Sequence, residues 1–421
     1  MEDLKSYKSE KLGDYIIDIA AGPFGSNLKV ECFVADGFPI IDGANLKEFK
    51  VTDNVTKFVT EQKARSLHRS IAKRNDVIVT ISGTVGQISY IPQNSKYTEY
   101  LISQRQFRVT FDETRVYVPY LVYYFHTKEG QHKILSFANQ TGVPALAQPL
   151  KNFRNIDITL PDISTQRRIA NILESIDEKI ALNNRINHNL EEQAQALYKS
   201  WFIDFEPFKD GKFIDSELGL IPDGWRIGTL SELGDIVAGG TPSKAKADYY
   251  TSSGIHWLTP KDLSNHCGKF TAKGETDITP LGYKNSSAKL MPRGTVLFSS
   301  RAPIGYITIA KNDICTNQGF KSVVPTNAGT GYIYYWLKEH TSDIEAQASG
   351  STFKEVSGAL MKSFSVLIPP KEITESFEEK IRPLLSAQEK IEEEVESLSQ
   401  ARDLLLPSLM SGTREINDLT C

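Results

Sequence analysis

The stretch Arg74-Asn-Asp-Val-Ile-Val-Thr-Ile-Ser82 returns 219 residues later as Arg293-Gly-Thr-Val-Leu-Phe-Ser-Ser-Arg301. In each copy an apolar, β-branched run is bounded by polar residues and glycine, which is typical of a half-buried strand with a turn at each end. Each copy is followed by a short loop that closes on a glycine, Gly86 or Gly305. A period of this length is far longer than a solenoid repeat and indicates a duplicated domain with its connecting helix.

Four further blocks repeat in the same order along the chain. They are Lys11–Asp14 with Glu232–Asp235, Gly37–Leu46 with Gly254–Leu263, Pro119–Phe125 with Gly331–Leu337, and Ile156–Pro161 with Phe364–Pro369. One matching block can arise by chance, but five in one order indicate duplication. Each copy mixes short strands with an aromatic helical run, so the sequence predicts two similar α+β domains, in residues 1–161 and, with a linker, 207–369.

The apolar pattern changes period after the last strand of each copy. From Gln166 to about Phe202, and again within residues 370–421, apolar residues recur at alternating steps of three and four. The first stripe holds Ile169, Ile172, Ile176, Asn183, Ile186, Leu190 and Leu197, and the second holds Leu384, Gln388, Ile391, Val395, Leu398, Arg402 and Leu405. We predict two long antiparallel helices, in residues 162–206 and 370–421, that pair as a coiled coil. The alternative is an ordinary surface helix, but about 37 residues span roughly 55 Å, which exceeds one domain.

Composition places the chain among globular proteins. Hydrophobic residues make up 40% and charged residues 24% of the 421, and no apolar run approaches the roughly 20 residues needed to cross a bilayer. The N-terminus lacks the pattern of a secretory signal. Cys32, Cys267, Cys315 and Cys421 show neither metal-ligand spacing nor a disulfide framework. We therefore expect a cytoplasmic protein without a membrane partner and without a metal site.

The net charge of −4 argues against a nucleic-acid partner when it is taken alone. The charges are unevenly distributed, however. Residues 1–155 hold 20 Lys+Arg against 16 Asp+Glu, and residues 211–369 hold 16 against 14, whereas residues 156–210 and 370–421 hold 6 against 10 and 6 against 12. The mildly basic domains permit DNA binding, and the acidity lies in the predicted helices.

Signatures of catalysis are missing from the sequence. It contains no GxxxxGK[ST] phosphate loop, no HExxH pair, no nuclease carboxylate pattern and no Asn-Pro-Pro-aromatic methyltransferase motif. The run Gly239-Gly-Thr-Pro-Ser-Lys244 could cradle an anion, although a turn near a DNA backbone is the favoured interpretation. The seven histidines are isolated. We expect no catalytic residue in this chain.

Five framework motifs are spread over the whole chain: Gly22-Pro-Phe-Gly-Ser-Asn-Leu-Lys29, Leu160-Pro-Asp-Ile-Ser-Thr-Gln-Arg-Arg-Ile169, Leu197-Tyr-Lys-Ser-Trp-Phe-Ile-Asp-Phe205, Glu217-Leu-Gly-Leu-Ile-Pro-Asp-Gly-Trp225 and Leu404-Leu-Leu-Pro-Ser-Leu-Met-Ser-Gly412. Through these motifs the chain resembles the specificity subunit of a type I restriction-modification system. This resemblance implies two target-recognition domains, each reading one half of a bipartite DNA site. It also implies that the helices act as a spacer and as a dock for two modification subunits, through which restriction and motor subunits join. S-adenosylmethionine, ATP and Mg are then expected on those partners.

Loops that carry forked donors and acceptors are the candidates for reading bases. Arginine pairs with guanine, asparagine or glutamine with adenine, and serine or threonine adapts to either. The candidates in the first domain are Ser26, Lys29, Asn45, Ser82, Thr84, Arg105, Gln140 and Thr141, and those in the second are Thr241, Ser243, Lys244, Lys261, Ser300, Arg301, Asn317, Gln318, Lys321 and Ser351. Arg105 and Arg301 are the leading candidates.

A non-catalytic protein-interaction scaffold is the main alternative, with the duplicated domains binding protein and the helices oligomerising. The two hypotheses differ in one measurable property. Phosphate contacts make DNA affinity fall steeply as salt rises, whereas a scaffold has little such affinity. The recognised DNA sequence itself cannot be read from the chain.

Overall fold

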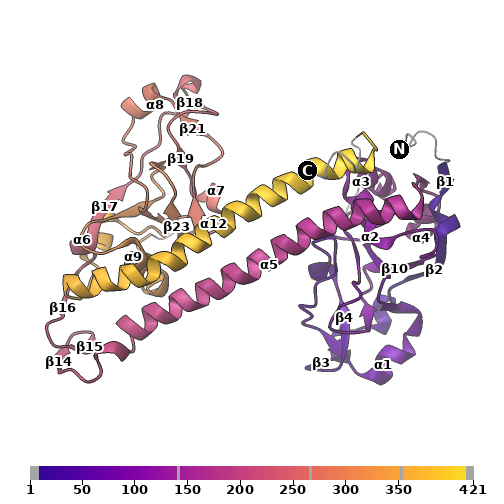
Figure 1. Ribbon diagram of the computed structural model, residues 1–421, viewed down its shortest axis with the longest axis horizontal. Coiled ribbons are helices and arrows are strands. Elements are labelled where there is room, and N and C mark those ends of the chain that lie inside the picture. Colours follow the sequence, from indigo (N-terminus) through magenta and orange to yellow (C-terminus); the bar gives the residue numbers. More distant parts are fainter. Residues whose placement is uncertain (1–8, 140–142, 265–267, 351–353, 414–421) are drawn as a thin grey trace. The chain divides into compact units, whose positions relative to one another are not determined.

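The structure is a computed structural model that describes residues 9–139, 143–264, 268–350 and 354–413. It contains two compact units: unit 1 is Met1–Ile180 with Ser397–Cys421, and unit 2 is Ala181–Glu396. The boundaries cut both long helices, so each unit holds one domain and a part of each helix. Figure 1 shows the elements. Among the described residues, no helix combines the length and apolarity that a membrane span requires.

Unit 1 builds its domain, here called domain 1 (residues 9–161), on two sheets. One is antiparallel, in the order β2-β10-β7-β8, and the other has the order β3-β5-β4-β9-β6. The elements are β1 (Ser9–Lys11), β2 (Ile16–Ala21), β3 (Phe33–Val34), β4 (Phe38–Ile41), β5 (Phe58–Val59), α1 (Glu61–Ser66), β6 (Ile71–Lys73), β7 (Val77–Thr80), β8 (Ile88–Tyr90), β9 (Glu99–Ile102), β10 (Gln106–Phe111), α2 (Val118–His126), α3 (Lys128–Leu135), β11 (Ala138–Asn139), β12 (Ala145–Leu146), α4 (Pro149–Arg154) and β13 (Asp157–Thr159).

Unit 2 builds domain 2 (residues 207–369) on one larger sheet. Its main sheet has the order β17-β25-β22-β23-β20, and smaller pairs surround it. The elements are β14 (Phe213–Ser216), β15 (Gly219–Pro222), β16 (Arg226–Thr229), α6 (Leu230–Leu233), β17 (Gly234–Ala238), β18 (Tyr250–Thr251), β19 (Trp257–Leu258), α7 (Pro260–Ser264), β20 (Phe270–Thr271), β21 (Asp277–Ile278), α8 (Pro280–Lys284), β22 (Val296–Ser300), β23 (Ile304–Ala310), β24 (Cys315–Thr316), β25 (Lys321–Pro325), α9 (Thr330–Glu339), α10 (Thr341–Ala346), α11 (Gly358–Ser363) and β26 (Ser365–Ile368).

The repeated segments Arg74–Ser82 and Arg293–Arg301 form an inner strand of each main sheet, β7 and β22. In β7, Val77 and Val79 enter one core and Ile78 enters another. In β22, Val296 and Phe298 enter one core and Leu297 another. Because successive side chains of a strand point to opposite faces, an unbroken apolar run suits a strand that is covered on both faces.

Strand register confirms most of the predicted correspondence between the copies. Val109 pairs with Val77, and Val323 pairs with Val296. Gly86 and Gly305 both adopt positive φ, at 91° and 95°, which favours glycine at the same point of each loop.

One predicted block is misaligned. The Leu12 amide donates to the Ile156 carbonyl and the Leu230 amide to the Phe364 carbonyl, at 2.8 and 2.9 Å. Leu12 therefore corresponds to Leu230 and not to Leu233, as the matching Leu-Gly-Asp letters predicted. Residue types agree when Leu12 is aligned with Leu233, but the structural correspondence depends on which backbone groups form hydrogen bonds.

Two 40-residue helices follow the last strands, α5 (Ile163–Phe202) and α12 (Lys371–Met410). Asp162 begins α5, because its carboxylate accepts from the amides of Ser164 and Thr165 at 2.9 and 3.0 Å. The hydroxyls of Ser164 and Thr165 also donate to this carboxylate, and they, with a smaller contribution from the two amides, lower the pKa of Asp162 to about 2. Buried Gln166 then accepts from the Tyr117 amide at 2.8 Å and so fixes α5 to the start of α2.

The helices run antiparallel within each unit. In unit 2 Asn183 donates to Glu394 and Asn187 to Glu392, and in unit 1 Arg402 pairs with Asp177 at 2.9 Å. In these pairs the residue number on α12 falls as the residue number on α5 rises. The prediction for the seam was wrong at Ile186, which is 41% exposed. Asn183, which the same predicted stripe contains one turn earlier, is buried and faces α12 as expected.

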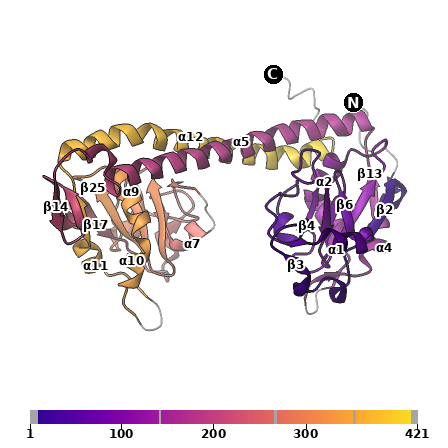
Figure 2. The same cartoon turned by 90° about the horizontal axis from the view of Figure 1, so that it is seen from below.

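Each domain encloses the start of one helix and the end of the other. The core of unit 1 joins Ile169 and Leu173 of α5 to Leu406, Leu409 and Met410 of α12. The core of unit 2 joins Phe377, Ile381 and Leu385 of α12 to Tyr198, Trp201 and Phe202 of α5. Since each fully buried large apolar side chain contributes about 1.5–3 kcal/mol, the helix ends belong to the domain cores. The aromatic helices α2 and α9 lie against α5 and α12 respectively (Figure 1, Figure 2).

Candidate nucleic-acid interface

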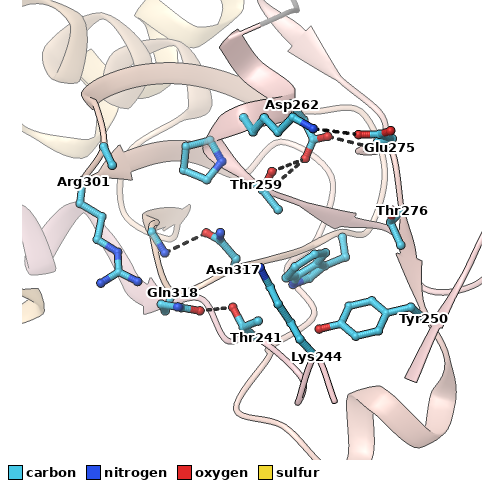
Figure 3. Close-up of a pocket in the computed structure, with 15 residues that line it drawn as sticks. Thr241, Lys244, Tyr250, Thr259, Asp262, Glu275, Thr276, Arg301, Asn317 and Gln318 are labelled. Carbon is cyan, nitrogen blue, oxygen red and sulfur yellow. Dashed lines mark hydrogen bonds and ion pairs between the residues drawn. The ribbon is translucent and has the colours of Figure 1, made fainter. Parts of the chain in front are cut away.

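A cavity of about 640 Å³ lies at one edge of the main sheet of domain 2 (Figure 3). The loops that follow β17, β19 and β22 line it, together with the loop that precedes β25. These loops meet because Ala238, at the end of β17, pairs with Lys321, at the start of β25, while β22 ends beside them at Ser300. Six predicted residues line this cavity: Thr241, Lys244, Lys261, Arg301, Asn317 and Gln318.

The inner wall of the cavity is held by close backbone packing. A Cβ atom on Gly239 would lie 2.0 Å from the Asn317 carbonyl oxygen, so only glycine lets these two loops approach. The Thr241 hydroxyl donates to the side-chain oxygen of Gln318 across the same contact, and the Trp257 indole donates to the Gly240 carbonyl at 3.0 Å. The polar side chains therefore stand on a fixed base.

The charged groups of this cavity are held loosely. Arg301 lies 3.2 Å from Glu355, and both side chains are more than a third exposed. Lys261 lies 3.5 Å from Glu275, with both side chains largely exposed. Ion pairs of this kind contribute about 0–1 kcal/mol, so the guanidinium and the ammonium can exchange a carboxylate for a base edge or a phosphate.

Domain 1 presents a related set of loops. Gly22 packs against Ser103 as tightly as Gly239 packs against Asn317, since a Cβ atom would lie 1.9 Å from the Ser103 carbonyl oxygen. This contact joins the loop that carries Ser26 and Lys29 to the loop that carries Arg105. All three of those side chains are exposed, as is Thr84, whereas Ser82 is half-buried and pairs with Ala145.

The two leading arginines do not occupy equivalent positions. Arg301 follows β22 and corresponds by register to Ser82, whereas Arg105 precedes β10 and corresponds to Gly319. The Arg105 guanidinium nevertheless lies 3.7 Å from the position that a Cβ atom on Gly83 would occupy. Gly83 belongs to the loop after β7, which corresponds to the loop of Arg301 in domain 2. Each domain thus offers one arginine near the same sheet edge, but from a different loop.

The structure removes three predicted residues from the set that could read bases. Asn45 is 4% exposed, and its amide donates to the carbonyls of Thr52 and Asn54, at 3.2 Å each. Ser300 is buried and its hydroxyl donates to the Gly319 carbonyl, while the buried Lys321 ammonium lies 3.4 Å from both Ser300 Oγ and Glu355. Their polar groups hold neighbouring backbone or side chains in place, which sequence pattern alone does not reveal.

Four predicted contact residues remain, one within the described residues and three outside them. Ser243 is exposed in the loop that carries Lys244. Gln140, Thr141 and Ser351 lie outside the described residues.

Phe24 is an apolar residue that was not among the predicted contacts, all of which are polar or charged. It is 83% exposed in the loop between Gly22 and Lys29, among predicted polar contacts. A single exposed apolar side chain is common on protein surfaces, so it is the place of Phe24 among the predicted polar contacts that makes it a candidate. The signal in the sequence was the placement of an aromatic residue between proline and glycine, Pro23-Phe-Gly25.

Comparison with known proteins matches both copies of the repeat. The family model described as type I restriction modification DNA specificity domain matches residues 29–192 and 222–400. The MjaIX specificity subunit of Methanocaldococcus jannaschii is 37% identical over 164 residues, which is 38% of each chain. The HindI specificity subunit of Haemophilus influenzae is 26% identical over 319 residues, which cover 61% of this chain and 69% of that protein.

Among solved structures, the fold is similar to that of the type I restriction-modification S subunit from M. genitalium. The TM-score is 0.64 at 16% sequence identity, over 96% of both chains. At this identity the likeness concerns the fold alone.

Proposed function

This chain belongs to the type I restriction modification DNA specificity family, and on that premise we propose that it is the subunit that reads a bipartite DNA site, with one half-site for each domain. The main support is the convergence in domain 2. Six residues that the sequence selected as base or phosphate contacts line one cavity at a single sheet edge. Members of the family recognise DNA and leave the chemistry to partner subunits, so the chain is not itself an enzyme.

The chemistry of the loops suggests how each half-site is recognised. Arg301 and Gln318 carry the forked donors and acceptors that pair with guanine and adenine in the major groove. Lys244 and, in domain 1, Lys29 are exposed ammonium groups suited to phosphates, which position a protein without reading sequence. Because the arginines come from different loops, the two half-sites are expected to differ, and the site as a whole to be asymmetric.

The paired helices act in this proposal as a spacer and as a docking element. Two modification subunits bind them, restriction and motor subunits join through the modification subunits, and S-adenosylmethionine, ATP and Mg reside on those partners. The acidic helices are not expected to contact DNA. Lengthening α5 between Gln166 and Phe202 should change the spacer and leave both half-site sequences unchanged. The assembly operates in the cytoplasm.

Methylome sequencing of a host with and without this chain tests the proposal. We expect one asymmetric bipartite methylation motif that is present only with the chain. A motif that persists without the chain, or no motif in its presence, would contradict the proposal.

Salt dependence separates DNA reading from the scaffold alternative. Each phosphate contact lowers the logarithm of affinity by about 0.9 per tenfold rise in salt. The complex with modification subunits should therefore lose cognate binding steeply as salt rises, whereas a scaffold would bind DNA weakly at every salt concentration.

A further inference from the structure

A buried lysine lies where domain 2 meets the two long helices. The side chain of Lys269, just before β20, is 6% exposed. Its ammonium lies 4.9 and 5.0 Å from the ring centres of Tyr334 and Tyr335 on α9. Burial lowers the pKa of Lys269, and the nearby Glu191 opposes that shift.

The partners of this ammonium come from three helices. Lys269 donates to Gln388 of α12 at 2.7 Å and to Tyr335 of α9 at 2.8 Å, and it forms an ion pair with Glu191 of α5. Glu191 in turn accepts from Tyr335 at 2.8 Å and from Gln388 at 3.2 Å. One cation therefore links domain 2 to both members of the helix pair.

Such a group defines register more strictly than apolar packing does. When a helix shifts along its axis, leucine or isoleucine side chains find similar apolar neighbours. A buried charge loses its specific partners in the same shift. A displacement of one helical turn, about 5.4 Å, would carry Lys269 away from Glu191 and Gln388. A buried ammonium without its partners is strongly unfavourable, just as one polar residue in a coiled coil fixes the register of its helices.

The corresponding place in unit 1 is built differently. The Tyr90 amide donates to the Phe49 carbonyl as the Ile309 amide donates to that of Lys269, at 3.0 and 2.9 Å, so Phe49 is the structural counterpart of Lys269. The cation there is Arg402 of α12, which lies 5.3 Å above the Phe49 ring and pairs with Asp177 of α5. In unit 1 the cation at the Phe49 position therefore comes from α12, and domain 1 adds the half-buried Lys50, which pairs with Glu174 of α5 at 3.2 Å.

We propose that Lys269 is a positioning residue that fixes where domain 2 sits along the helix pair, and that it thereby sets the half-site spacing that the complex accepts. This inference rests on the proposed function. Its consequence is that spacing, and not half-site sequence, depends on Lys269.

The test uses the complex with modification subunits and three duplexes, whose half-sites are separated by the natural spacer or by one base pair more or less. Methylation rates give the ratio of off-spacing to natural-spacing activity. Lys269→Met should raise this ratio at least about tenfold, which corresponds to about 1.4 kcal/mol of lost discrimination. Duplexes with one scrambled half-site should be rejected as strongly as by the unmodified complex.

A matched control is Arg293→Met. Arg293 also joins domain 2 to α12, through Glu389 at 2.6 Å, but its side chain is 61% exposed. The Arg293→Met variant removes one positive charge at the same joint, but an exposed ion pair contributes little. It should therefore leave the spacing ratio unchanged.

The double variant Lys269→Met/Glu191→Gln separates positioning from stability. It removes both charges of the buried pair, and the Lys338 ammonium that it releases from Glu191 is on a side chain that is 38% exposed to water. The double variant should therefore unfold at a temperature close to that of the unmodified protein and still accept the wrong spacings. A spacing ratio unchanged in this double variant would overturn the proposal, even if Lys269→Met alone fails to fold. If the unmodified complex does not distinguish scrambled from cognate half-sites, the proposed function fails first, and the two failures are thereby distinguished.

Discussion

Domain 1 and domain 2 share the inner strands of their main sheets but differ in the side chains that the neighbouring loops present. The central strands β7 and β22 pair with β10 and β25 in the same register. The leading arginine comes from the loop before β10 in domain 1 and from the loop after β22 in domain 2. The sheet edge therefore works as a platform on which loop chemistry changes without a change of fold.

The same contrast holds where each domain meets the helices. Domain 1 places Phe49 there and receives a cation from α12, whereas domain 2 places Lys269 there and receives its acceptors from α5 and α12. Tyr123 and Tyr335 occupy matching sites on α2 and α9, and both donate to carboxylates of α5, Asp177 and Glu191. Duplication preserved the scaffold, and the charged contacts diverged afterwards.

The largest predicted difference between the joints concerns stability. Glu191→Ala leaves the buried Lys269 ammonium without its carboxylate and should destabilise unit 2 by about 3–5 kcal/mol. Asp177→Ala should cost unit 1 only about 1–3 kcal/mol, because Arg402 is less buried and keeps Asp403 at 2.9 Å.

Tryptophan fluorescence can follow unit 2 by itself. All four tryptophans, Trp201, Trp225, Trp257 and Trp336, lie in that unit. Hydrogen exchange of α2 amides can follow unit 1. Equal losses of stability in the two units would show that the joints are energetically alike.

Acid should loosen the joint of unit 2 through Glu191. Burial raises the pKa of this carboxyl, but the charges of Lys269 and Lys338 outweigh burial and lower it to about 2. The folded pKa lies below the ordinary 4.5, so the stabilisation is fully present above about 4.5 and is lost as pH falls from there toward about 2.

Denaturation midpoints of tryptophan fluorescence across this pH range test the expectation. Glu191→Gln should make the fall in stability shallower. Asp162 titrates in the same range, but it belongs to unit 1 and does not contribute to this signal. An identical slope with glutamine would assign the acid sensitivity to other carboxyls.

Substitutions in the recognition loops of the two domains should affect different half-sites. Arg301→Ala should weaken methylation of cognate DNA by about 1–3 kcal/mol, roughly 5- to 150-fold, and relax specificity only at the second half-site. Arg105→Ala should do the same at the first half-site. Methylation rates on duplexes with single-base changes provide the measurement. Unchanged rates and specificity with Arg301→Ala would remove this residue from the interface.

The smallest predicted effect concerns Phe24. The corresponding loop of domain 2, between β17 and β18, carries Thr241, and its aromatic residue Tyr249 is buried. Because the Phe24 ring is 83% exposed, Phe24→Ala should leave the unfolding temperature unchanged. If the ring packs on a thymine methyl or between bases of the first half-site, the substitution should weaken binding by about 1 kcal/mol, roughly fivefold. Fluorescence anisotropy with each half-site scrambled in turn would detect the loss, which should vanish when the first half-site is scrambled.

Much of the fold could be predicted from the sequence, because apolar periodicity and turn residues are local properties. The central strands and both long helices followed from these patterns. The displaced match at Leu12 did not, since register depends on which backbone groups pair. The exposure of Ile186 was also missed, because the partner helix selects which face of α5 is buried.

The site could be predicted less completely. Residue type selected loops that the structure brings together in domain 2, where Thr241, Lys244 and Gln318 line one cavity. It could not distinguish a free amide from the amide of Asn45, which is occupied by its own backbone neighbours. Nor could it identify Lys269, whose role depends on residues more than 70 positions away in α5 and more than 110 away in α12.

The central claim is that each domain reads its own half of one DNA site. A photoreactive side chain placed at Lys29 in domain 1, or at Lys244 in domain 2, can map these contacts in the complex with modification subunits. We predict crosslinks from position 29 to one half-site only and from position 244 to the other half-site only. Crosslinks from both positions to the same half-site, or none above those to a scrambled duplex, would contradict the account.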